Sequence, residues 1–116
     1  MSDPPLDPSR IARLERLGGR ALVVEMIDTF AAAATLRRAA LQHALTSGDL
    51  VALSQGAHAI VAGAGQLGAT ALMIEARRVE ESVRLGDGAA ALGATPALLA
   101  TFDEALSALR RVREER

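Results

Sequence analysis

Apolar residues recur at intervals of three and four positions through most of this chain, and this spacing limits the fold more than any other feature. An α-helix turns once every 3.6 residues, so such a series lies on one face of a helix. The longest series runs from Val23 to Leu45. Alanine, leucine and arginine favour helix, and the alternating β-branched residues typical of strands are missing. The sequence therefore predicts an all-α protein.

Helix-capping signals divide the chain into segments. Asp7-Pro8 and Thr95-Pro96 each combine an N-cap residue with proline at the first helical position, and Ser47-Gly48-Asp49 combines a stop with a new cap. We expect helices over about 8–17, 20–46, 50–64, 69–85 and 95–112, with residues 86–94 as a loop or frayed turn. Short connections join antiparallel neighbours. The predicted architecture is an antiparallel up-down four-helix bundle with a short additional N-terminal helix.

Composition excludes several classes of function. The chain has 116 residues, no cysteine and a net charge of −1, so we expect neither thiolate metal sites nor a nucleic-acid partner. No apolar run approaches the ~20 residues of a membrane span, and residues 1–10 lack a signal-peptide pattern. We expect a flexible leader at residues 1–6, a single helical-bundle domain at residues 7–116 and a cytoplasmic protein without a membrane partner.

His58 is the residue that most suggests a function. The predicted buried stripe of its helix passes through residues 53, 57, 60, 64 and 67, and His58 lies well away from it. The positions one and two turns from His58 carry no side chain longer than valine. Another protein could therefore approach the imidazole, although a surface histidine without a role is the ordinary alternative. The short residues on this face are Val51, Ser54, Ala62 and Gly65.

The motif around His58 resembles the histidine phosphotransfer (HPt) domain of two-component phosphorelays. The matching pattern is a histidine, an apolar residue two positions later, a run of small residues and an apolar-glycine pair. Here these are His58, Ile60, the Ala62-Gly63-Ala64-Gly65 run and Leu67-Gly68. Upstream, the likeness extends to Leu17-Gly18-Gly19, to Phe30 and to Ser47-Gly48-Asp49-Leu50, so that it covers about residues 11–110. Many HPt domains carry lysine and glycine three and four residues after the histidine, where this chain has Val61 and Ala62.

The resemblance implies a bacterial phosphocarrier without its own ATP-binding or kinase domain. His58 would accept a phosphoryl group from the aspartate of a response-regulator receiver domain and pass it to another receiver. The implied partners are receiver domains and a hybrid sensor histidine kinase, with the chain acting as a monomer. No cofactor or metal site is expected in the chain itself, because Mg²⁺ belongs to the receiver. The alternative is an HPt-like binding module that sequesters a receiver without transfer.

The resemblance also implies roles for residues around His58. Glu80 matches a position that often bonds the ring nitrogen not being phosphorylated, although it could instead pair with Arg77 or Arg84. His43, opposite the apolar stripe of its helix, is interpreted as a solvated surface residue. The expected partner-binding residues are Ile11, Ser54, Gln55, Val61, Ala62, Gly65 and Arg77.

Overall fold

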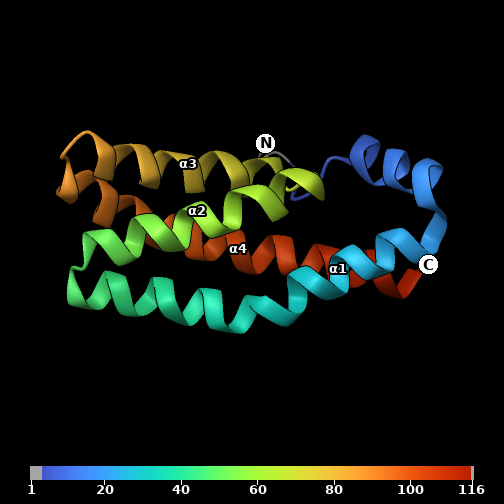
Figure 1. Ribbon diagram of the computed structural model, residues 1–116, viewed down its shortest axis with the longest axis horizontal. Coiled ribbons are helices and arrows are strands. Elements are labelled where there is room, and N and C mark those ends of the chain that lie inside the picture. Colours follow the sequence, from blue (N-terminus) through green and yellow to red (C-terminus); the bar gives the residue numbers. More distant parts are fainter. Residues whose placement is uncertain (1–3, 116) are drawn as a thin grey trace.

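Four helices make up the protein in a computed structural model that describes residues 4–115 (Figure 1). They are α1 (Pro8–Ser47), α2 (Leu50–Gln66), α3 (Thr70–Arg84) and α4 (Gly88–Glu115). The described residues contain no strand, which confirms the all-α prediction. Two or three residues join each helix to the next, and the chain reverses direction at each connection (Figure 1).

Helix α1 is interrupted near its start. Gly19 has φ 71° and ψ −173°, so two helical segments meet there at a kink. Only glycine adopts this backbone conformation without strain. The first segment begins at Asp7, whose side chain accepts a hydrogen bond from the Ser9 amide at 3.0 Å. The short N-terminal helix expected from the sequence thus corresponds to the segment of α1 before Gly19.

The N-terminal segment is attached to the turn between α2 and α3. The amide of Asp7 donates to the carbonyl of Gly68 at 2.7 Å, and Leu6 packs against the hydrophobic core. Residues 1–3 of the expected flexible leader lie outside the described residues. Because of the packing of Leu6 and the hydrogen bond of Asp7, the end of the expected leader is held on the bundle.

The prediction that the last helix starts at Thr95-Pro96 is wrong. Helix α4 begins at Gly88 and includes Pro96 in its interior. Asp87 is the actual capping residue, since its carboxylate accepts from the Ala90 amide at 3.0 Å. Thr95 is fully buried, and its hydroxyl donates to the Ala91 carbonyl at 2.8 Å. The burial of Ala91 in the core stabilises this early helical stretch, which the local sequence signal did not indicate.

The core has the composition that the periodicity predicts. All five residues of the predicted stripe, four on α2 and Leu67 at its C-cap, are at most 1% exposed. At the centre, Phe102 of α4 stacks against Phe30 of α1, with ring centroids 5.8 Å apart. Glycines let α2 approach its neighbours closely, because a Cβ at Gly63 would lie 3.1 Å from the Phe30 ring. In the described part of the chain no helix is long and apolar enough to cross a membrane.

Two exposed ion pairs join α1 to α4 and predict a loss of stability in acid. Arg38 contacts Asp103 at 2.7 Å, and Arg113 contacts Asp28 at 2.5 Å. The hydrogen bonds from these arginines hold the pKa of each aspartate below its usual value. Between the lowered folded-state pKa and the ordinary unfolded value, the unfolded chain binds more protons. The pairs therefore contribute stability above about pH 4, and this contribution disappears as the pH falls through the folded-state pKa values.

We expect the double variant Asp28→Asn/Asp103→Asn to lose less stability than the wild type between pH 6 and pH 2.5. Urea unfolding midpoints measured across this range test the prediction. Glu104→Gln is the control, because it removes a carboxylate beside Asp103 that forms no ion pair with the described residues. Equal acid sensitivity in the wild type and the double variant would contradict it.

Candidate functional site

The imidazole of His58 stands on the outer surface of α2. Its side chain is 76% exposed, whereas the neighbouring stripe residues Ala57 and Ile60 are fully buried. The helix begins at Asp49, whose carboxylate accepts from the Ala52 amide at 3.0 Å. This cap and the buried stripe together set the rotation of α2. His58 is consequently directed to solvent.

Glu80 of α3 holds one nitrogen of the His58 ring. The Nδ1 atom of His58 lies 2.6 Å from Oε2 of Glu80, whose side chain is 32% exposed. An ionised carboxylate can only accept hydrogen bonds, so Nδ1 carries the proton in this contact. In the neutral ring the lone pair is then on Nε2, the nitrogen on the side of the ring away from Glu80. The arrangement offers an exposed nucleophilic nitrogen on a ring of fixed orientation.

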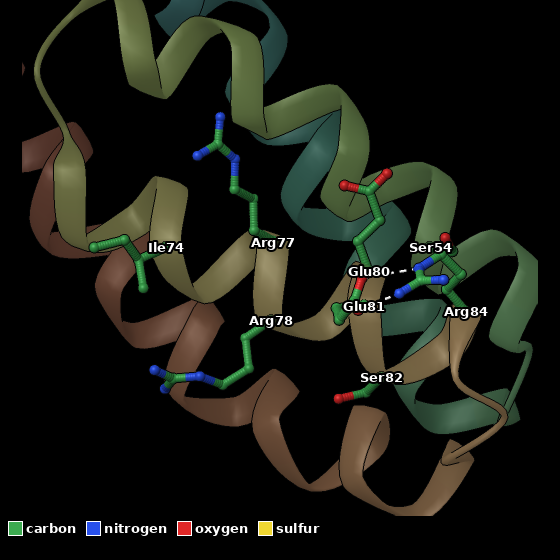
Figure 2. A pocket seen from close by; sticks show the side chains of 8 residues that line it. All are labelled: Ser54, Ile74, Arg77, Arg78, Glu80, Glu81, Ser82 and Arg84. Atoms are coloured by element: carbon green, nitrogen blue, oxygen red, sulfur yellow. Dashed lines mark hydrogen bonds and ion pairs between the residues drawn. The ribbon is translucent and has the colours of Figure 1, made fainter.

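The alternative pairing of Glu80 with an arginine is not what the structure shows. Arg84 bonds to Glu81 through both Nε and Nη2. Glu80 and Arg77 extend from α3 in the same direction, and Arg78 extends in another (Figure 2). Ser54 of α2 lines the hollow shown there, together with these α3 side chains.

Most of the other residues expected to meet a partner lie on the accessible surface. Gln55, Ala62 and Arg77 are exposed, and Val61 is partly buried. Gly65 is partly buried as well, and a Cβ there would lie 3.2 Å from the sulfur of Met73. Its lack of a side chain therefore also allows α2 and α3 to approach each other closely.

Ile11 is a correction to the expected binding surface. Its side chain is only 3% exposed and belongs to a cluster of buried residues with Val23 and Leu109. It is buried because the segment of α1 before the kink folds back onto the end of the bundle. A buried side chain cannot contact a partner, so Ile11 is not part of the binding surface.

An apolar groove on the other side of His58 was not predicted. It has a volume of about 350 Å³ and lies between α1 and α2. From α2 it is bordered by Ala59, next to His58, and by Ala62 one turn further on. The groove was missed because its other wall belongs to α1, distant in the sequence. The lining residues on α1 are the apolar Leu22, Met26, Phe30 and Ala33 and the polar or charged Glu25, Thr29 and Arg37.

Arg37 at the edge of this groove was also missed. Its Nη1 atom donates to the carbonyl of Ala59 at 2.7 Å. The bond ties α1 to the helical turn that carries His58, across 22 positions of sequence. No local signal distinguishes Arg37 from other arginines of the chain. The second histidine, His43, is exposed.

Comparison with known proteins identifies the family and a protein of similar fold. The family model described as Hpt domain matches residues 25–112. The crystal structure of histidine-containing phosphotransfer protein B (HptB) from Pseudomonas aeruginosa PAO1 is similar over 99% of both chains, with 28% sequence identity and a TM-score of 0.85. A search of curated protein sequences finds no match.

A bundle of helices with an exposed histidine is consistent with a phosphotransfer module, and the family match over residues 25–112 shows that this is the class of the protein. The chain belongs to the Hpt domain family. It is a histidine phosphotransfer protein of two-component signalling, similar in its whole fold to HptB. Hpt domains are phosphocarriers and contain no kinase domain.

Proposed function

We propose that Nε2 of His58 accepts a phosphoryl group from the phospho-aspartate of a receiver domain and passes it to the aspartate of a second receiver. The observation that supports this proposal is the exposed ring of His58, whose Nδ1 is hydrogen-bonded to Glu80. The lone pair of Nε2 attacks phosphorus, and the bond from phosphorus to the aspartate oxygen breaks. The aspartate carboxylate leaves with the electron pair. Nδ1 keeps its proton, so the ring loses none during the transfer.

The contribution of this chain is a positioned nucleophile. Phosphoryl transfer depends mainly on alignment and on stabilising charge. The hydrogen bond to Glu80 supplies orientation and stabilises the positive charge that develops on the ring as Nε2 bonds to phosphorus. The receiver would supply the aspartate and the Mg²⁺, so we expect the chain to act without a cofactor of its own. We further propose that it acts as a monomer in the cytoplasm.

The groove between α1 and α2 is the surface that we propose for receiver docking. Its α1 side is mostly apolar, with Glu25, Thr29 and Arg37 among the apolar residues, and its α2 side has alanine and glycine next to His58 and Gln66 further along. A helix of a receiver could lie in such a groove while the receiver's phospho-aspartate faces His58. A small contact of this kind is typical of transient signalling complexes. The sensor kinase would contact the chain through its own receiver domain.

A transfer assay tests the proposal. The purified chain is mixed with a receiver domain that has been phosphorylated on aspartate and separated from its kinase. Phosphate that appears on the chain, is labile in acid and is stable in alkali supports the phosphocarrier. Tight binding without transfer would overturn it and favour a module that sequesters the receiver.

We expect Glu80→Ala to reduce the rate of phosphoryl transfer about tenfold, the lower range for a charge-assisted hydrogen bond because this one is partly exposed. Glu80→Gln should lose less, because its amide oxygen still accepts from Nδ1. Initial rates of transfer from the phosphorylated receiver measure the effect. The matched control is Glu81→Gln, a neighbouring carboxylate bonded to Arg84 and not to His58. Equal rates for Glu80→Ala and Glu81→Gln would contradict the role of Glu80.

A further inference from the structure

Arg77 lies about one helical turn before Glu80 on α3, and the two side chains extend from the helix in the same direction (Figure 2). Figure 2 shows both side chains extending from the same side of α3, whereas Arg78 extends elsewhere. Arg77 lines two hollows in the surface of the protein. One contains Ser54 and Glu80, and the other contains Val61 and Ala62 of the turn that follows His58. The guanidinium therefore stands beside the face of α2 that carries the histidine.

Charges around His58 are unbalanced once its Nε2 carries phosphate. A phosphoryl group at neutral pH has a charge of about −1.5 to −2, and the Glu80 carboxylate lies on the other side of the same ring. Such a concentration of negative charge raises the free energy of the phosphorylated form unless a cation is close. A guanidinium is the side chain best suited to contact phosphate oxygens.

Two of the nearby arginines already have partners among the residues that the structure describes. Arg84 is bonded to Glu81, and Arg37 is bonded to the Ala59 carbonyl. Arg77 forms no ion pair with the described residues. Three residues of helix separate it from Glu80, an axial distance of about 4.5 Å that an extended arginine can bridge.

We propose that Arg77 binds the phosphoryl group on Nε2 of His58 and stabilises the phosphorylated state of the carrier. This inference rests on the proposed function and identifies the cation that serves it. In the unphosphorylated chain Arg77 is exposed and can adopt other rotamers. Once phosphate is present, the guanidinium moves over the hollow formed by Val61 and Ala62 to contact its oxygens. Val61 and Ala62 leave that space open because their side chains are short.

The experiment measures the ionisation of the phosphoryl group itself. Phosphoramidate is the phosphoryl donor: the bond from phosphorus to its amide nitrogen breaks, ammonia leaves, and Nε2 bonds to phosphorus. All variants carry His43→Gln, so His58 is the one histidine left of the two in the chain. The phosphorus resonance is then followed by NMR against pH at low ionic strength, where charge effects are least screened.

We expect Arg77→Gln to raise the midpoint of this titration by about half a pH unit, the effect of removing a unit positive charge at ~6 Å in surroundings like water. Arg77→Lys should keep most of the wild-type value. Arg78→Gln is the matched control, since it removes the same charge from the adjacent position, which points elsewhere. Arg77→Gln should also shorten the half-life of the phosphohistidine.

The possible results distinguish a failure of the role inferred for Arg77 from a failure of the proposed phosphocarrier function. A midpoint raised in Arg77→Gln but not in Arg78→Gln supports the inference. Equal midpoints in the wild type and Arg77→Gln, or equal shifts in both glutamine variants, overturn it and leave the phosphocarrier assignment standing. A chain with His43→Gln that takes no phosphate from phosphoramidate or from a phosphorylated receiver overturns both.

Discussion

Replacing His58 with glutamine should reduce phosphoryl acceptance to below detection while leaving the helical bundle intact. Glutamine has nearly the length of histidine but has no nucleophilic nitrogen, so no bond to phosphorus can form. The side chain is 76% exposed, and substitutions at such surface positions usually change stability by about 0.5 kcal/mol or less. The measurement is phosphate incorporation from a phosphorylated receiver, together with thermal unfolding followed by circular dichroism.

His43→Gln provides the control for this experiment. His43 is exposed on α1, as His58 is on α2, and it forms no hydrogen bond with the described residues. It should incorporate phosphate at the wild-type rate. Phosphate on the His58→Gln chain, or its loss from the His43→Gln chain, would place the acceptor elsewhere.

The largest effect on stability is expected from Phe102→Ala. Phe102 is fully buried at the centre of the core, where its ring stacks on Phe30. Truncating a buried phenylalanine costs about 3–5 kcal/mol, because hydrophobic burial is lost and a cavity remains. A domain of this size has a total stability of about 5–15 kcal/mol. We therefore expect the melting temperature to fall by about 10–20 °C.

Urea unfolding of Phe102→Ala and of Leu36→Ala measures this contribution against a matched control. Leu36 is also apolar but is 77% exposed, so its truncation should leave the unfolding midpoint nearly unchanged. The Phe102 cavity should also loosen α2, because the Phe30 ring lies so near Gly63 of α2 that an added Cβ would be 3.1 Å from it. A loss below about 1 kcal/mol in Phe102→Ala would show that the core around this ring contributes little.

Membership of the Hpt family explains why so few residues around His58 carry chemistry. In a phosphorelay the carrier is a substrate of its partners, and it needs a reachable nitrogen and a surface that a receiver can meet. The short side chains of Ala59 and Ala62 beside His58 leave its surroundings open. Where many relatives have a lysine, this chain has Val61, and we propose that Arg77 on the neighbouring helix supplies the cation.

The elements that the sequence predicted correctly are those where a local pattern and the tertiary contacts agree. The stripe on α2 depends on helical periodicity, and every member of it is buried. The caps at Asp7 and Asp49 depend on residues two or three positions apart, so they too were readable from the sequence. The direction of His58 follows from the same periodicity, because a residue off the buried stripe must face outward.

Only the tertiary structure decided the features that join distant parts of the chain. Glu80 is 22 positions from His58, and only the family resemblance, not a local pattern, indicated their contact. The same separation divides Arg37 from Ala59, whose contact nothing in the sequence indicated. Which of several acidic or basic side chains forms each contact depends on how the helices pack, and the local sequence carries no record of it. Helix α4 shows the same limit, since a cap at Asp87 and the burial of Ala91 outweigh the stronger local signal at Thr95-Pro96. The periodic pattern determined the helices and the exposed histidine of this protein, whereas packing free energy determined which residues surround that histidine.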